Sequence, residues 1–286
     1  MLRDIIRLGI LVLLGLMFSS GDPSPLVLFM GFASIAASSA FANVVNDIYD
    51  LELDKKTKAY RPLPSGRYSV GEAWGASIGF LVIALSTGAI AFMFSESIIL
   101  FAVLLAAPLG CFAYSGTPIR LKARSWLGVG TISLIYLTPL ITGFVIGGSS
   151  SQGLPLVLLM LYTIFLASAV KDFEDVQVDG SMGVTTPPVR YGTKATAKIL
   201  GYAGIVGVAL AGAISAWYLA QDHLSQGLFS LALIPSYVIY VRRIRSYSES
   251  ISFEQLMILV KGCLRYMYIW PFVAALAFLL VPRFIG

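Results

Sequence analysis

Two short acidic segments contain the side chains best suited to chemistry. Both carry the spacing Asp-x-x-Asp-x-x-x-Asp, and the second copy is displaced from the first by 125 residues. The aspartates are Asp47, Asp50 and Asp54 in the first segment and Asp172, Asp175 and Asp179 in the second. The whole chain has only 15 acidic residues, so we interpret the repeated spacing as a functional pair.

The residue types in these segments favour an oxygen-ligated metal ion. On a continuous helix, each set of aspartates would occupy one face, which in the first segment also carries Asn46. Two such faces opposed would surround one cavity with carboxylates, which repel one another unless cations neutralise them. Carboxylates without His or Cys suit Mg²⁺, which keeps water and substrate phosphate among its ligands. The alternative is that these helix-end carboxylates only pair with Lys and Arg side chains of nearby loops.

Basic side chains in the loops beside the acids could hold a phosphorylated ligand. They are Arg61, Arg67, Arg120, Lys122, Lys171 and Arg190. A diphosphate held by Mg²⁺ and these cations becomes a good leaving group, because the charge that develops as its bond breaks is stabilised. Tyr114 precedes two of these cations, and the face of its ring could stabilise a carbocation on the other fragment.

The elements that must position these residues are apolar helices. Of the 286 residues, 57% are hydrophobic and 12% are charged, whereas soluble domains carry about 25% charged residues. Nine apolar stretches lie near residues 5–20, 26–46, 74–94, 98–114, 126–147, 154–171, 197–220, 225–241 and 256–282. We therefore predict an all-α, multi-pass integral membrane protein of about nine transmembrane helices, forming a single domain over residues 1–286.

The distribution of basic residues predicts the topology. With nine spans, 19 of the 20 Lys and Arg residues fall on the side of the N-terminus, which the positive-inside rule makes cytoplasmic. Four spans separate the two acidic segments, so both face the cytoplasm and the chain is interpreted as two four-helix repeats plus one helix. Topology and contact with membrane lipids then account for Arg242, Arg243, Arg245, Lys261 and Arg265. The net charge of +5 needs no nucleic acid as a partner.

The acidic segments resemble the two aspartate motifs of the UbiA family of intramembrane prenyltransferases. The matching stretches are Asn46-Asp-Ile-Tyr-Asp50-Leu-Glu-Leu-Asp54 and Lys171-Asp172-Phe-Glu-Asp175-Val-Gln-Val-Asp179. Residues 61–67 are similar to the family's segment after the first motif, and residues 114–122 to its Tyr/Lys loop. The resemblance implies Mg²⁺-dependent transfer of a prenyl group from a polyprenyl diphosphate to a lipophilic acceptor.

The same resemblance implies roles for individual residues. The ligands of Mg²⁺ and diphosphate would be Asn46, Asp50, Asp54, Asp175 and Asp179. Arg61, Lys122 and Lys171 would bind diphosphate. Tyr114 would lie near the reacting carbon, and Asp172 would position the acceptor or a base.

The Lys-Asp-Phe-Glu-Asp form of the second segment is most similar to the archaeal ether-lipid branch of the family. That branch transfers geranylgeranyl to the hydroxyl of geranylgeranylglyceryl phosphate. An aromatic acceptor, such as 4-hydroxybenzoate or a quinone precursor, is the alternative within the family. A secondary transporter is the alternative class, although transporter acids usually lie near the bilayer midplane rather than at helix ends beside basic loops.

Overall fold

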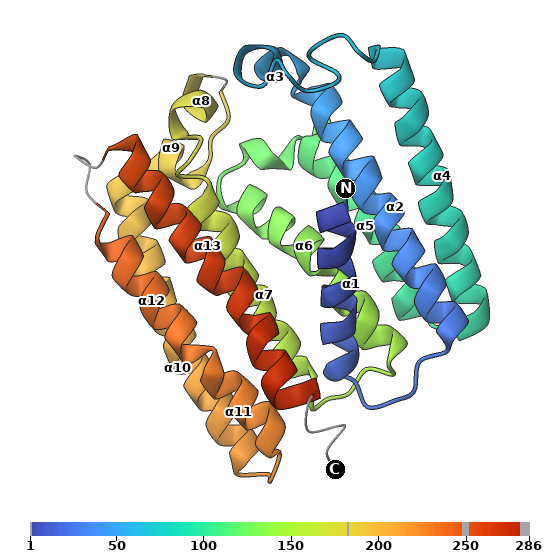
Figure 1. Ribbon diagram of the computed structural model, residues 1–286, viewed down its shortest axis with the longest axis vertical. Coiled ribbons are helices and arrows are strands. Elements are labelled where there is room, and N and C mark those ends of the chain that lie inside the picture. Colours follow the sequence, from blue (N-terminus) through green and yellow to red (C-terminus); the bar gives the residue numbers. More distant parts are fainter. Residues whose placement is uncertain (1, 182, 248–251, 281–286) are drawn as a thin grey trace. The chain divides into compact units, whose positions relative to one another are not determined.

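The computed structural model describes residues 2–181, 183–247 and 252–280, and these residues are helical with no β-strand (Figure 1). Eight helical segments within this range are long and apolar enough to cross a membrane. A shorter apolar helix, α1 (Leu2–Met17), precedes them. The predicted all-α, multi-pass membrane architecture of about nine helices is therefore confirmed.

The spanning segments follow the predicted apolar stretches closely. They are α2 (Pro25–Tyr49), α4 (Val70–Ser95), α5 (Ile98–Ser115), α6 (Trp126–Ile146), α7 (Leu154–Lys171), α10 (Thr193–Leu219), α11 (Leu224–Ala232) with α12 (Ile234–Arg245), and α13 (Phe253–Ala275). A π-helical turn, η2 (Leu276–Leu280), continues α13. The stretch predicted at 225–241 is divided into two helices because Pro235, in the first turn of α12, has no N–H to continue the hydrogen-bond ladder of α11.

Short helices follow the spans that carry the acidic segments. They are α3 (Leu51–Thr57) after α2, and α8 (Val176–Ser181) and α9 (Pro187–Tyr191) after α7. A single 3₁₀ turn, η1 (Leu121–Ala123), lies between α5 and α6. Because α3 and α8 begin 125 residues apart, the element order repeats with the same displacement as the aspartates.

The chain forms two compact units. The first comprises Met1–Lys122 and Leu134–Ser149, and the second comprises Ala123–Ser133 and Ser150–Gly286. Helix α6 contributes residues to both units. The assignment of residues 1–286 to a single domain stays a prediction.

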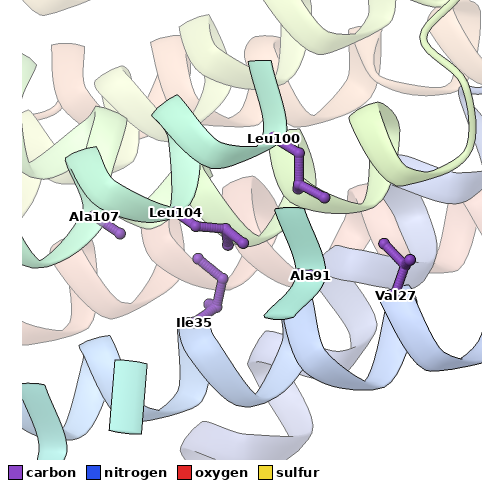
Figure 2. Close-up of a cluster of buried hydrophobic side chains, with 6 residues drawn as sticks. All are labelled: Val27, Ile35, Ala91, Leu100, Leu104 and Ala107. Atoms are coloured by element: carbon purple, nitrogen blue, oxygen red, sulfur yellow. The ribbon is translucent and has the colours of Figure 1, made fainter. Parts of the chain in front are cut away.

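The first unit is built on close packing of α2, α4 and α5. Figure 2 shows its central hydrophobic cluster, formed by Val27, Ile35, Ala91, Leu100, Leu104 and Ala107. The buried hydroxyl of Ser34 donates to the carbonyl oxygen of Ala84 at 2.8 Å and so ties α2 to α4. Small residues also allow contact between backbones, since a Cβ on Gly15 of α1 would overlap the carbonyl oxygen of Leu140 in α6.

The second unit is built around α7, which is buried along most of its length. Tyrosine hydroxyls bind it to neighbouring helices: Tyr237 of α12 shares a hydrogen bond of 2.6 Å with Thr163, and Tyr240 donates to the carbonyl of Leu166 at 3.2 Å. Buried polar groups need such partners inside an apolar bundle. These contacts fix α12 against the helix that carries the second acidic segment.

Candidate active site

The first acidic motif (Asn46, Asp47, Asp50 and Asp54) lies at the junction of α2 and α3. Asp50 is the junction residue, with φ −98° and ψ 8° between the two helices. Its N–H donates to the carbonyl of Asn46 at 2.9 Å, and the N–H of Asp54 donates to the carbonyl of Asp50 at 2.8 Å. The helical spacing therefore continues through the junction, as the prediction of one acidic face requires.

Lys122 occupies the point at which Asn46 and Asp50 converge. Its Nζ lies 2.6 and 2.7 Å from the two carboxylate oxygens of Asp50 and 3.2 Å from Oδ1 of Asn46. Ser115, in the last turn of α5, donates to the same Oδ1 at 3.0 Å. An ammonium surrounded by three oxygens is strongly held, because both partners in its contacts with Asp50 are ionised.

Arg61 joins the other two carboxylates of the motif. Its Nη1 donates to Oδ1 of Asp47 at 2.9 Å and to Oδ2 of Asp54 at 2.8 Å. Lys58 adds a third cation, with Nζ 3.4 Å from Oδ1 of Asp54. Asp54 is only 1% exposed, so its charge depends on these partners rather than on water.

The other residues predicted in this part of the chain are Arg67, Arg120 and Tyr114. Arg67 is exposed and donates to the carbonyl of Tyr60 and to Oγ of Ser65, which closes the loop after α3. Arg120 is half-buried with a positive φ of 38°, in the turn that leads to Lys122. Tyr114 is half-buried in the last turn of α5.

Lys58 and Ser115 of this network were not predicted, and Asp47 was placed on the acidic face without a role of its own. Lys58 is four residues after Asp54, a spacing that brings side chains together on a helix. Nothing in the sequence indicates Ser115, since only the packing of α5 against α2 brings its hydroxyl to Asn46.

The second acidic motif (Asp172, Asp175 and Asp179) does not lie on one continuous helix, which differs from the prediction. Helix α7 ends at Lys171, residues 172–175 form a turn, and α8 begins at Val176. The N–H groups of Phe173 and Glu174 bond to carbonyls three residues back, which tightens the end of α7. The turn buries Phe173, whose ring packs edge-on against Tyr247 at 5.4 Å, and leaves Asp175 exposed.

Electrostatics in the second motif differ from those in the first. The pKa of the Asp172 carboxyl is raised to about 7, mainly by burial and also by the carboxylates of Asp179 and Asp175, while Lys171 opposes the shift. Burial also raises the pKa of Glu174. Within the described ranges, no ion pair of 4 Å or less joins Asp172 or Asp175 to a cation. Within this motif, burial therefore favours the protonated form of the Asp172 carboxyl.

Two predicted basic residues belong to this part of the chain. Lys171 ends α7, is exposed, and acts on Asp172 through its charge. Arg190 lies on α9 with its guanidinium 5.4 Å from the centre of the Tyr191 ring, and no contact with an aspartate accompanies this stacking in the described residues. The structure therefore brings Lys171, but not Arg190, to the second motif.

The donor set of the first motif fits a hard, oxygen-ligated cation. Lys122 demonstrates this, since its ammonium is a cation held by oxygens of Asn46 and Asp50. Among the described residues, no group of three or more His, Cys, Asp or Glu side chains is close enough to hold a metal by itself. Mg²⁺ needs only one or two carboxylates, because it takes water and substrate phosphate as its other ligands.

The helices and the paired acidic motifs define a multi-pass membrane protein with cation- and anion-binding groups at helix ends. The family profile described as the UbiA prenyltransferase family matches residues 8–262. The chain therefore belongs to the UbiA prenyltransferase family, and the resemblance found in the two motifs is confirmed.

Individual relatives agree with this assignment. The chain is 32% identical over 159 residues to digeranylgeranylglyceryl phosphate synthase of Methanocaldococcus jannaschii, a match that covers 54% of this chain and 52% of the relative. It is 30% identical over 187 residues to the bacteriochlorophyll synthase 33 kDa chain of Rhodobacter capsulatus, covering 62% and 59%. The match thus spans little more than half of each relative.

A solved structure matches almost the whole fold. The UbiA homolog from Archaeoglobus fulgidus bound to DMAPP and Mg²⁺ superposes with a TM-score of 0.73 at 22% identity. The superposition covers 94% of this chain and 97% of the homolog. At this level of identity the likeness establishes a common fold.

Proposed function

We propose that the protein is a Mg²⁺-dependent intramembrane prenyltransferase that moves a prenyl group from a polyprenyl diphosphate to a lipophilic acceptor. The observation that carries this proposal is the network of Asp47, Asp50 and Asp54 with Arg61 and Lys122, in a member of a prenyltransferase family. It combines carboxylates for a metal with cations for a diphosphate. Such a combination suits a reaction in which diphosphate leaves.

In this proposal the residues divide the work as follows. Mg²⁺, held by Asn46, Asp50, Asp54, Asp175 and Asp179, would neutralise the diphosphate and stabilise it as a leaving group. Arg61 and Lys122 donate hydrogen bonds to diphosphate oxygens, with Lys171 as a further cation. The ring of Tyr114 faces the electron-deficient prenyl carbon. Asp172 positions the acceptor or receives the proton that its hydroxyl loses.

The proposed reaction exchanges one C–O bond for another. The C–O bond between the prenyl carbon and the diphosphate breaks, and the bonding pair leaves with the diphosphate. The acceptor oxygen forms the new C–O bond and gives up its proton. Arg61 and Lys122 are already charged and fixed by the acids they contact, so little reorganisation accompanies the development of charge on the leaving group.

We propose the hydroxyl of geranylgeranylglyceryl phosphate as the acceptor and geranylgeranyl as the transferred group. Support comes from the relative in Methanocaldococcus jannaschii, which is a digeranylgeranylglyceryl phosphate synthase. An aromatic acceptor is the alternative. We also propose that the N-terminus and both acidic motifs face the cytoplasm, because 19 of 20 basic residues fall on that side of a nine-span topology.

The test offers purified full-length protein in lipid nanodiscs labelled geranylgeranyl diphosphate with either geranylgeranylglyceryl phosphate or 4-hydroxybenzoate. We expect a labelled diether product with the glyceryl acceptor, only when Mg²⁺ is present. Product with the aromatic acceptor alone would contradict the proposed acceptor but would support the proposed prenyl transfer. No product with either acceptor, together with ion-coupled flux in liposomes, would replace the enzyme by a transporter.

A further inference from the structure

A cationic cavity in the second unit takes no part in the proposed reaction. It lies between α12 and α13, has a volume of about 320 Å³, and is lined by Arg243, Ile258, Lys261, Gly262, Arg265 and Tyr266. Three of these six residues, Arg243, Lys261 and Arg265, carry cationic side chains. Its volume falls within the roughly 300–1,000 Å³ that small-molecule sites occupy.

The wall of this cavity is shaped to hold the Arg243 guanidinium. Gly262 has no side chain, and a Cβ there would come within 2.5 Å of Cζ of Arg243. The guanidinium also lies 6.0 Å from the centre of the Tyr266 ring, an arrangement that favours a cation. Arg243 is therefore held across the surface of α13, beside Lys261 and Arg265, rather than extended into solvent.

The three cations are not balanced by ion pairs in the part of the chain that the structure describes. Glu174 interacts with Lys261 only through longer-range electrostatics. Like charges gathered on the flank of a membrane-spanning helix are unfavourable unless an anion joins them, and such residues mark functional sites by default.

The cavity lies near one end of a candidate membrane span. From Leu224 to Arg243, helices α11 and α12 supply 20 residues, which at 1.5 Å per residue span about 30 Å, the thickness of the hydrocarbon core. Arg243 therefore lies near the end of this candidate span, where a lipid headgroup would be within reach. On the same face of α13, Ile269, Val273 and Leu276 continue away from the cations and are each about half exposed.

The arrangement has the two parts that an anionic lipid requires. Lys261 and Arg265 are exposed at one end of the α13 face, and the apolar residues follow at helical spacing toward the membrane interior. We propose that this cavity binds the phosphate of an anionic bilayer phospholipid, with an acyl chain along Ile269, Val273 and Leu276. The basic headgroup contacts and the apolar track together favour a lipid over a soluble phosphate.

The experiment measures binding, so it is independent of prenyl transfer. Full-length protein in nanodiscs is given fluorescent phosphatidylglycerol or phosphatidylcholine with the same chains, and retention is measured by energy transfer from the protein. We expect wild-type protein to prefer phosphatidylglycerol. The double variant Lys261→Gln with Arg265→Gln should lose about tenfold or more of that preference, since each charge-assisted contact with phosphate is worth at least about tenfold.

A matched control and a rescue separate the cavity from general surface charge and from misfolding. Arg242→Gln removes the same charge from the exposed neighbour of Arg243, outside the cavity lining, and should keep the wild-type preference. Lys261→Arg with Arg265→Lys retains both charges and should keep it as well.

Three results would overturn the proposal: equal retention of both lipids by wild-type protein, an unchanged preference in the double variant, or an equal loss in Arg242→Gln. Displacement by millimolar glycerol 1-phosphate would assign the cavity to a soluble phosphate instead. Displacement by geranylgeranylglyceryl phosphate in the absence of any phosphatidylglycerol preference would assign it to the acceptor. Both of these outcomes also contradict a bilayer lipid site.

Discussion

The two acidic motifs have the same spacing in sequence, but their carboxyl groups lie in different electrostatic environments in the structure. In the first motif, Asp50 is paired with Lys122, and Asp47 and Asp54 share Arg61. In the second, burial and neighbouring carboxylates raise the pKa of Asp172 to about 7. The first motif supplies cations to its carboxylates, although burial still raises the pKa of Asp47, and the second contains a carboxyl, Asp172, whose pKa rises to about 7.

This difference follows from the backbone around each motif. The first remains nearly helical through Asp50, and the chain returns at Arg61 and Lys122 to the same face. The second is interrupted by a turn that buries Phe173 and places Asp172 at the end of α7. An identical pattern of acids is therefore not sufficient to predict equal charge states.

The largest effect should come from removing one carboxylate charge in each motif. Asp50→Asn and Asp175→Asn should each lower kcat/KM for prenyl transfer by about 100- to 1,000-fold, the usual cost of losing one group that stabilises transition-state charge. Labelled product formation at saturating Mg²⁺ measures this. Glu52→Gln is the matched control, because Glu52 is exposed and pairs with Lys55, and its activity should stay within about twofold of wild type. Full activity in Asp175→Asn would confine the chemistry to the first motif.

Arg61 should matter more for stability than Lys171, the cation beside the second motif. Arg61→Ala leaves the buried Asp54 with only Lys58 and should destabilise the protein by about 2 kcal/mol, which corresponds to about 4–8 °C in Tm. Lys171→Ala, at an exposed position, should change stability by less than about 0.5 kcal/mol. Thermal unfolding in detergent measures both. Equal losses would mean that the second motif also depends on ion pairing.

Asp172→Asn should have a smaller effect that depends on pH. The folded protein holds the Asp172 proton up to a pKa of about 7, against 3.8 ordinarily, so the wild type loses stability as the pH rises through this range. The asparagine variant has no proton to release at this position, so it does not lose stability in this way as the pH rises. The Tm of the variant, measured without Mg²⁺, should therefore rise relative to wild type by a few degrees between pH 4 and pH 7. A constant difference across this range would mean that Asp172 is ionised throughout.

Arg67→Ala should have the smallest effect. Arg67 contacts only the Tyr60 carbonyl and Ser65 within the described structure, on an exposed loop. We expect the KM for the prenyl diphosphate to change by less than about twofold, in contrast with Arg61→Ala. A larger rise in KM, with Tm unchanged, would place Arg67 on the substrate and restore the role that its position in the sequence suggests.

Much of the fold could be predicted from the sequence because each span is a long apolar stretch bounded by turn residues and charges. The family was also evident, since its two motifs are local. Contacts within one segment, such as Arg61 with Asp54, were accessible for the same reason. Ser115 reaches Asn46 only through helix packing, which periodicity does not indicate.

Two features of the structure could not be predicted from the sequence, each for a physical reason. A periodic pattern assumes a continuous helix, so the turn at residues 172–175 could not be anticipated; it forms as Phe173 enters the core. From the sequence, Arg243, Lys261 and Arg265 were explained by topology and general contact with membrane lipids, not by a shared cavity. Their convergence depends on the close contact of α12 with α13 at Gly262, which the amino-acid composition does not indicate. The catalytic and metal-binding roles of the predicted residues stay predictions.

The close contact between α1 and α6 has a consequence for biogenesis. With 16 residues, α1 is shorter than the roughly 20 that span a bilayer alone, and a Cβ at Gly143 would overlap the Val12 carbonyl, so the two backbones touch. Its packing partner is synthesised more than 120 residues after it. During translation, this backbone contact can form only after α2, α4 and α5 have been synthesised, whereas the packing of α1 on α2 can form earlier.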